Sequence, residues 1–254
     1  MRILYQLTSP MHKTVGSAEV ARRQGVLQAN AAAGTEVIAE PTMAGPAAIE
    51  SAHDAGLVVP ELMRLAPLAQ SRGFEALIIG CYSDPGLDAL RELLTIPVIG
   101  PGAASLHLAA QLGTRISVLT PSGRGYGRVA QRLRALGLAP LFASVRGIGL
   151  SVMDLAKQAP GALDKAARAA QAAVEQDGAD VLVLGCMSMA FLPDITSKLG
   201  ERVGVPIVNP VLAALKVAEA LVSMRLTHSK QAWPPPKLEE IACGPRGQAR
   251  PPQA

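Results

Sequence analysis

Two nearly identical segments limit what this 254-residue chain can fold into. Residues 76–81 read Ala-Leu-Ile-Ile-Gly-Cys and residues 181–186 read Val-Leu-Val-Leu-Gly-Cys, so the two cysteines, at 81 and 186, lie 105 positions apart. A second apolar segment with an internal proline follows each of them, at 96–101 and at 205–210. This repeat predicts two copies of one structural unit, each with a cysteine at the end of a strand.

Short apolar runs alternate with longer stretches of helical spacing over the whole chain. The expected strands are 3–6, 36–39, 77–80, 98–100, 116–120, 141–145, 181–185 and 207–209. The expected helices are 18–33, 57–70, 86–93, 103–112, 128–136, 163–176, 193–199 and 211–224. Continuous apolar strands flanked by helices indicate parallel sheets that are covered on both faces. The predicted fold class is therefore α/β.

The repeat also predicts two interleaved domains. The first comprises residues 1–99 with 210–227 and the second residues 100–209, because the helix expected after Pro210 matches the one after Pro101. Ligands of parallel α/β sheets bind at the carboxyl ends of the strands, so both cysteines are expected at one cleft. Residues 228–254 are a Pro- and Gly-rich tail without regular elements. Cys243 lies in this tail and is assigned no role.

Composition excludes several classes of protein. Apolar residues make up 49% of the chain, which excludes a disordered or fibrous chain. A net charge of only +4 and an aromatic share of 3% argue against nucleic-acid binding. The apolar runs are too short to span a bilayer, and the N-terminal residues turn polar too soon for a signal peptide. A cytoplasmic protein without nucleic-acid or membrane partners is expected.

Spacing of the reactive residues argues against bound metals and dinucleotides. Three cysteines and four scattered histidines match neither a disulfide framework nor a zinc site. Gly100-Pro101-Gly102 lacks the third glycine of the dinucleotide-binding fingerprint. Chemistry without metal or cofactor is therefore expected. Arg22 and Arg23, like Arg132 and Arg134, are interpreted as solvated helix faces.

Cys81 and Cys186 are the candidate catalytic residues. Each follows a strand and a glycine and precedes a predicted helix, where the helix dipole and free N–H groups favour a thiolate. Ser83-Asp84-Pro85 is interpreted as the cap and first turn of the helix after Cys81. A single cysteine at a strand end is often only a small core residue, but packing alone explains two at equivalent positions poorly. Two such groups across a cleft suit inversion of a carbon acid, since a thiolate removes a proton from one face and a thiol returns one to the other.

The chain resembles the Asp/Glu/hydantoin racemase superfamily, and most closely its hydantoin racemase-like branch. The resemblance is carried by the segments 45–51, 80–87, 145–155 and 177–186. It implies two pseudo-symmetric Rossmann- or flavodoxin-like α/β domains with parallel sheets, and an active site in the cleft between them. It also implies racemisation without a cofactor and a homo-oligomer.

By position, the resemblance implies that Cys81 and Cys186 are the two acid/base residues. It further implies substrate-binding residues that follow the cysteines and two other strands: Gln6, Ser9, Tyr82, Ser83, Thr120, Ser122, Met187 and Ser188. The polar residues among them can equally be simple helix caps or turn formers.

The leading hypothesis is a cofactor-independent racemase or epimerase of a small carbon acid, such as a hydantoin, allantoin or an amino acid. Two alternatives stay open at this stage. One is a decarboxylase or cis-trans isomerase of the same superfamily. The other is a non-catalytic small-molecule binding protein in which the cysteines are merely packed.

Overall fold

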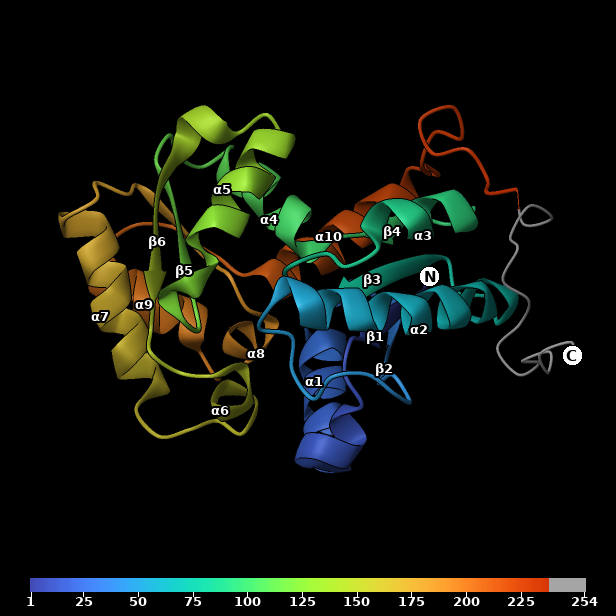
Figure 1. Cartoon of the computed structure of the whole chain (residues 1–254), viewed down its shortest axis with the longest axis horizontal. Coiled ribbons are helices and arrows are strands. Elements are labelled where there is room, and N and C mark those ends of the chain that lie inside the picture. Colours follow the sequence, from blue (N-terminus) through green and yellow to red (C-terminus); the bar gives the residue numbers. More distant parts are fainter. Residues whose placement is uncertain (238–254) are drawn as a thin grey trace, which may run out of the picture.

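The computed structural model of the chain describes residues 1–237 (Figure 1). Two four-stranded sheets lie side by side, with the orders β2-β1-β3-β4 and β6-β5-β7-β8. The strands are β1 (Arg2–Leu7), β2 (Glu36–Glu40), β3 (Ala76–Gly80), β4 (Val98–Ile99), β5 (Ile116–Thr120), β6 (Phe142–Gly147), β7 (Val181–Leu184) and β8 (Ile207–Val208). All pairings are parallel, and both sheets have the flavodoxin-like order of strands. The predicted α/β class with two similar parallel sheets is confirmed.

The helices cover both sheets. They are α1 (Ser17–Ala29), α2 (Ala52–Ser71), α3 (Leu87–Leu93), α4 (Pro101–Ala109), α5 (Tyr126–Ala135), α6 (Val152–Ala156), α7 (Ala162–Glu175), α8 (Met187–Ala190), α9 (Ile195–Val203) and α10 (Pro210–Ser223). Short turns of other helix types are η1 (His12–Gly16), η2 (Gly123–Gly125) and η3 (Ala139–Leu141). The eight expected helices are all present. Sequence periodicity missed α6 and α8 because each is shorter than the window in which a helical period can be recognised.

Helix α2 begins earlier than predicted because a capping box starts it. The Ser51 hydroxyl accepts a hydrogen bond from the Asp54 amide at 3.1 Å, and the Asp54 carboxylate accepts one from the Ser51 amide at 3.0 Å. This reciprocal pair satisfies two of the amides that a helix start leaves without partners. The box fixes the start of α2 directly after residues 45–51, which reach the site described below.

Helices α4 and α10 join the two sheets. Helix α10 follows the last strand of the second sheet but lies against β3 and β4 of the first, whereas α4 follows β4 and lies against β7 and β8. The two helices pack on each other at the junction of the sheets (Figure 1). The predicted domains, residues 1–99 with 210–227 and residues 100–209, assume that each sheet is covered by a helix that follows the other sheet. Their boundaries stay a prediction.

A glycine ends β3, and another follows β7, where the neighbouring strand comes close. A Cβ on Gly80 would lie 2.7 Å from the Gln6 carbonyl oxygen in β1, and a Cβ on Gly185 would lie 2.7 Å from Val118 in β5. Real Cβ atoms do not approach other atoms this closely, so each glycine allows the central strand of its sheet to lie beside the segment that carries the cysteine. Close packing of the strands thus explains why a glycine precedes the cysteine in both copies of the repeat.

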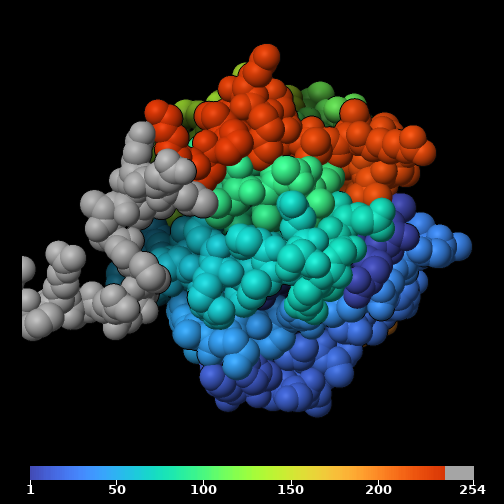
Figure 2. Space-filling view, turned by 90° about the vertical axis from the view of Figure 1, so that its right-hand side faces the viewer, coloured from blue at the N-terminus to red at the C-terminus, as the bar shows by residue number. Residues whose placement is uncertain are grey.

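Residues 228–233 of the predicted tail form no helix or strand, as expected, but they pack on α3 and β4. The Lys230 ammonium donates to the carbonyls of Arg91 and Leu94 at 2.6 Å each, where α3 ends. The Trp233 indole N–H donates to Asp88 at 3.0 Å. In Figure 2 the red end of the described chain lies against the green and teal surface of this side of the molecule. Cys243 lies outside the described residues.

No helix within residues 1–237 is long and apolar enough to cross a bilayer.

Candidate active site

A cavity of about 1410 Å³ opens between the two sheets. Its walls include the segments that follow β1 and β3 in the first sheet and β5 and β7 in the second. In each sheet these two strands are neighbours at the point where the strand order reverses, which is where doubly wound sheets bind ligands. The cavity therefore combines the two equivalent ligand positions of the two sheets.

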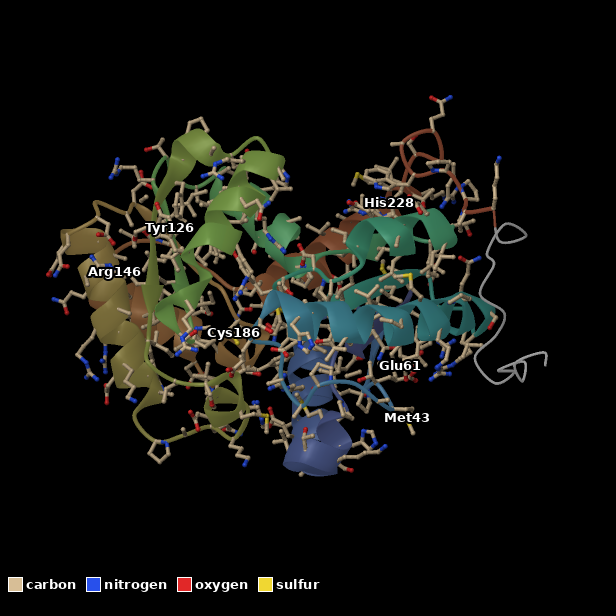
Figure 3. All side chains as sticks on the ribbon, in the orientation of Figure 1. Met43, Glu61, Tyr126, Arg146, Cys186 and His228 are labelled. Carbon is tan, nitrogen blue, oxygen red and sulfur yellow. The ribbon has the colours of Figure 1, made fainter. Side chains whose placement is uncertain are left out.

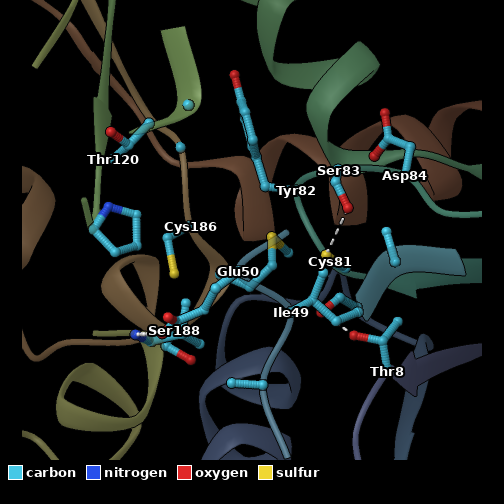
Figure 4. A pocket seen from close by; sticks show the side chains of 18 of the residues that line it. Thr8, Ile49, Glu50, Cys81, Tyr82, Ser83, Asp84, Thr120, Cys186 and Ser188 are labelled. Carbon is cyan, nitrogen blue, oxygen red and sulfur yellow. Dashed lines mark hydrogen bonds between the residues drawn. The ribbon is translucent and has the colours of Figure 1, made fainter. Parts of the chain in front are cut away.

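Cys81 and Cys186 line this cavity from different sheets. Cys81 follows β3 and is partly exposed, and Cys186 follows β7 with 6% of its surface exposed. Figure 3 shows Cys186 near the middle of the molecule. In the close-up of Figure 4 the two cysteines enter from opposite sides, with Tyr82 between them in this view. The cleft thus brings the predicted pair together.

The environment of both thiols disfavours the thiolate, which contradicts the expectation from helix dipoles. Burial raises the pKa of Cys81 above its usual value and raises the pKa of Cys186 to about 11. Cys81 does not lie at a helix start, because α3 begins only at Leu87. Cys186 does precede α8, but α8 has only four residues, too few to develop a large dipole.

Two opposing effects reduce the penalty that burial imposes on each thiolate. The Ser83 side chain and backbone lower the pKa of Cys81, and the backbone amides of Met189 and Ser188 lower that of Cys186. Both serines stand two positions after their cysteine. The Cys81 sulfur lies 3.1 Å from the Ser83 hydroxyl, as the dashed line in Figure 4 marks.

The predicted cap at Ser83-Asp84-Pro85 is wrong. Gly86 is the N-cap of α3, whereas the Asp84 carboxylate accepts hydrogen bonds from the amides of Gly102 and Ala103 at 2.8 and 2.9 Å, at the start of α4. The loop after Cys81 is therefore anchored to the helix that leads into the second sheet. Local spacing favours the nearer helix, because Gly102 lies 18 positions after Asp84.

Seven of the eight predicted substrate-binding residues line the cavity, namely Ser9, Tyr82, Ser83, Thr120, Ser122, Met187 and Ser188. Gln6 is not among the lining residues. Its amide is buried and donates to the Glu40 carbonyl at 2.8 Å and the Leu7 carbonyl at 3.2 Å. Since Gln6 points to the edge strand β2, the first loop contributes Thr8 and Ser9 to the cavity instead.

Arg23 and Arg132 also line the cavity, so their assignment to solvated helix faces is wrong. Only 2% of Arg23 is exposed, and it pairs with the buried Glu19 at 2.8 Å. Arg132 pairs with Asp84 at 2.6 Å. The spacing of Glu19, Arg23 and Leu27 along one buried face of α1 is the signal that places Arg23 inside.

Glu50 bridges the two walls of the cavity. Its carboxylate accepts a hydrogen bond from the Val152 amide at the start of α6 at 2.6 Å, and its carbonyl accepts one from Arg128 of α5 at 3.0 Å. Glu50 precedes α2 of the first sheet, while α5 and α6 lie in the second half of the chain. The segment 45–51 thus closes one side of the cleft. Residues 1–237 contain no cluster of histidine, cysteine and acidic side chains that suits a metal ion.

Comparisons with known proteins agree with this geometry. The family model described as Asp/Glu/Hydantoin racemase matches residues 19–218. A hydantoin racemase of Paenarthrobacter aurescens is 34% identical over 200 residues, which cover 78% of this chain and 84% of that protein. The solved allantoin racemase from Klebsiella pneumoniae superposes with a TM-score of 0.85 at 28% identity, covering 93% and 94% of the two chains. The allantoin racemase from Pseudomonas fluorescens gives 0.83 at 30% identity, covering 93% and 97%.

The fold, the two-sided cavity and these relatives define an isomerase of the racemase class. The chain belongs to the Asp/Glu/hydantoin racemase family. The resemblance drawn from the sequence segments around the two cysteines is confirmed at the level of the family.

Proposed function

We propose that this racemase inverts a hydantoin-type ring carbon, as in 5-substituted hydantoins and allantoin, with Cys81 and Cys186 as its two bases and without a cofactor. The observation that carries the proposal is that two cysteines at equivalent positions of two similar sheets line one cavity. The names of the relatives, hydantoin racemase and allantoin racemase, support the substrate class.

Proton transfer in this scheme needs one thiolate and one thiol at a time. The thiolate on one side removes the proton from the ring carbon, so that the C–H bond breaks and an S–H bond forms. The electron pair moves into the adjacent carbonyl, and the opposite thiol then delivers its proton to the other face. The enzyme ends with the protonation states of Cys81 and Cys186 exchanged, which prepares it for the opposite enantiomer.

The charges next to the two cysteines favour a hydantoin ring over an amino acid, while Arg124 and Arg128 line a more distant part of the same cavity wall, around α5. Arg23 and Arg132, which contact the segments after the cysteines, are each paired with a carboxylate of the protein. Neither is left as a counter-ion for the carboxylate of a free amino acid. A ring carbon next to a carbonyl is also more acidic than the α-carbon of an amino-acid zwitterion, so buried thiols can deprotonate it more easily.

Incubation of each enantiomer of allantoin and of a 5-substituted hydantoin in D2O tests the proposal. Optical rotation reports inversion, and mass spectrometry reports deuterium uptake. Wild-type enzyme is expected to give both together for at least one of these rings. Cys81→Ser and Cys186→Ser are each expected to lose racemisation by about 10²- to 10⁴-fold, because an alcohol is a poor base near neutral pH.

Each cysteine variant is further expected to keep slow deuterium exchange into one enantiomer only, opposite for the two variants. Cys243→Ser serves as the control thiol variant and should behave as wild type. Full racemase activity in Cys81→Ser or Cys186→Ser would rule out the two-cysteine mechanism. A chain that binds these rings but shows neither inversion nor exchange would be a binding protein instead.

The expected homo-oligomer and the cytoplasmic location stay predictions. Size-exclusion chromatography with light scattering measures the first directly.

A further inference from the structure

Two arginines occupy the same place in equivalent helices. Helix α1 follows β1 in the first sheet, and α5 follows β5 in the second. Arg23 lies six positions after the first residue of α1, Ser17, and Arg132 lies six positions after the first residue of α5, Tyr126. Each helix packs on its own sheet, α1 on β2 and α5 on β6. The two arginines are therefore related by the same repeat as the two cysteines.

Arg132 reaches from the second sheet to the loop that carries Cys81. Its guanidinium donates to the carbonyl of Tyr82 at 2.8 Å, to the carbonyl of Ser83, and to the carboxylate of Asp84 at 2.6 Å. It also lies 5.8 Å from the centre of the Tyr82 ring. Three consecutive residues after Cys81 are thus held by one side chain from across the cleft.

Arg23, on α1 of the first sheet, makes the reciprocal contact with α8, the short helix that begins directly after Cys186. It donates to the Ser188 hydroxyl at 3.0 Å and lies 4.9 Å from the centre of the Phe191 ring. Its neighbour Arg22 donates to the Phe191 carbonyl at 2.9 Å. Glu19 accepts from both arginines at 2.7 to 2.8 Å, which holds Arg23 in place although it is buried.

We propose that Arg132 and Arg23 are reciprocal positioning residues, Arg132 for proton transfer by Cys81 and Arg23 for proton transfer by Cys186. Each arginine lies on a helix of one sheet and holds the segment that follows the cysteine of the other sheet, so each supports one of the two half-reactions. This inference rests on the proposed two-cysteine function. It adds that the enzyme's two bases are tuned separately, each from the opposite sheet.

The positive charges of the two arginines also favour the thiolate forms of the cysteines. The guanidinium of Arg132 lowers the pKa of Cys81, and that of Arg23 lowers the pKa of Cys186, against the larger effect of burial. Asp84 acts in the opposite sense on Cys81, and the Cys81 thiolate does so on Cys186. Removing one arginine should therefore raise the pKa of one cysteine in particular.

Deuterium exchange without inversion separates the two half-reactions. A thiolate takes the ring proton, the new S–H exchanges with D2O, and deuterium returns to the same face, so each enantiomer reports on one cysteine. The overall rate of racemisation cannot distinguish the two half-reactions. The two enantiomers have equal free energy, so losing either base lowers kcat/KM equally in both directions.

The test measures exchange into each enantiomer of a hydantoin substrate in D2O for Arg132→Gln and Arg23→Gln. One enantiomer is the one that Cys81→Ser fails to exchange. Arg132→Gln should slow exchange into this enantiomer by on the order of tenfold or more, and slow exchange into the other enantiomer much less. Arg23→Gln should show the opposite preference, matching Cys186→Ser. In each variant, the rise of the exchange rate with pH should move to higher pH for the affected enantiomer. The rate profile for the other enantiomer should stay in place.

Further variants separate charge from anchoring and protect the test against misfolding. Arg132→Lys should keep the pH limb near its wild-type position but recover the rate only in part, because one ammonium cannot bond three acceptors in the fixed geometry of a guanidinium. Ser188→Ala removes the hydroxyl that accepts from Arg23 but keeps the ion pair between Arg23 and Glu19. It should reproduce the Arg23→Gln preference more weakly. Arg134→Gln, at an exposed position of the same helix as Arg132, should leave both exchanges unchanged.

Equal losses of exchange into both enantiomers in folded Arg132→Gln would overturn the inference, as would an unshifted pH limb. These results leave the proposed function intact if the cysteine variants still exchange opposite enantiomers. Retained racemisation in Cys81→Ser and Cys186→Ser would overturn the proposed mechanism and this inference together.

Discussion

At the scale of single residues, the two glycines before the cysteines decide how close the strands can lie. Gly80 and Gly185 each face the backbone or a side chain of the adjacent central strand at a distance that leaves no room for a Cβ. An added Cβ would strain the structure at either site, because the neighbouring strands are buried and cannot easily move aside. The position of each cysteine therefore depends on the residue before it.

Gly80→Ala and Gly185→Ala are each expected to destabilise the protein by about 1 to 3 kcal/mol. Urea unfolding followed by circular dichroism measures the loss. The matched control is Gly25→Ala in the exposed middle of α1, where an added Cβ meets nothing within 4 Å. That change should stabilise by about 0.5 to 1 kcal/mol, because alanine is the better helix former. Wild-type stability in both strand variants would show that the sheets adjust to the extra carbon.

At the scale of elements, the segment 227–233 completes the end of α3. Lys230 bonds the carbonyls that the helix leaves without partners, in the position where a cation also interacts well with the helix dipole. Trp233 lies over the Arg91 guanidinium at 4.9 Å and lines the rim of the cavity. The His228 Nε2 lies 2.8 Å from the Val98 amide and 3.1 Å from the Val98 carbonyl. An unprotonated Nε2 accepts from the amide, whereas a protonated Nε2 can only donate to the carbonyl.

Acidification is expected to release this segment. Burial, with the nearby charge of Arg91, lowers the pKa of His228 to about 4, from 6.5 in the unfolded reference. A released segment therefore binds a proton more readily than the docked one, so docking is favoured above pH 6.5 and weakens as the pH falls from 6.5 to 4. Trp233 is the only tryptophan of the chain, and its fluorescence should shift to longer wavelength over this range.

His228→Gln is the variant for comparison, since its amide oxygen can accept from Val98 but does not titrate. Its Trp233 emission should stay constant between pH 6.5 and 4. The same fluorescence change in the variant would show that His228 does not control the transition.

At the scale of the whole molecule, the two sheets share one core. A single cluster of buried side chains runs from Ile3 and Tyr5 in the first sheet to Val118 and Leu184 in the second, and includes Leu106 of α4. A separate, smaller cluster lies under α2. The exchange of α4 and α10 between the sheets makes each sheet depend on a helix that follows the other. The two sheets that enclose the cavity are held together by side-chain packing as well as by the covalent connections between them.

One cooperative unfolding transition is therefore expected, with a calorimetric enthalpy close to the van't Hoff enthalpy. Differential scanning calorimetry measures both. Leu106→Ala, at a fully buried position of α4, should lower the free energy of unfolding by about 2 to 5 kcal/mol and shift the whole transition. Two resolved transitions, only one of which moves in Leu106→Ala, would show that the sheets unfold independently.

Several features of the molecule are determined by local sequence alone. The alternation of short apolar runs with helical stretches determined all eight strands and the principal helices, because burial of a strand on both faces leaves a continuous apolar run. The repeat of strand, glycine and cysteine placed Cys81 and Cys186 at equivalent strand ends. Equal strand order puts both cysteines at the ligand-binding end of their own sheets.

Contacts between distant residues decided the rest. Arg23 and Arg132 look like solvated residues in the sequence, because their acceptors, Ser188 and the loop after Cys81, are 165 and about fifty positions away. Asp84 looks like part of a local cap, yet it binds the start of α4. The direction of the cysteine pKa shifts depends on burial, which the chain acquires only when both sheets assemble. Sequence patterns report local periodicity, whereas desolvation and hydrogen-bond partners are properties of the assembled cleft.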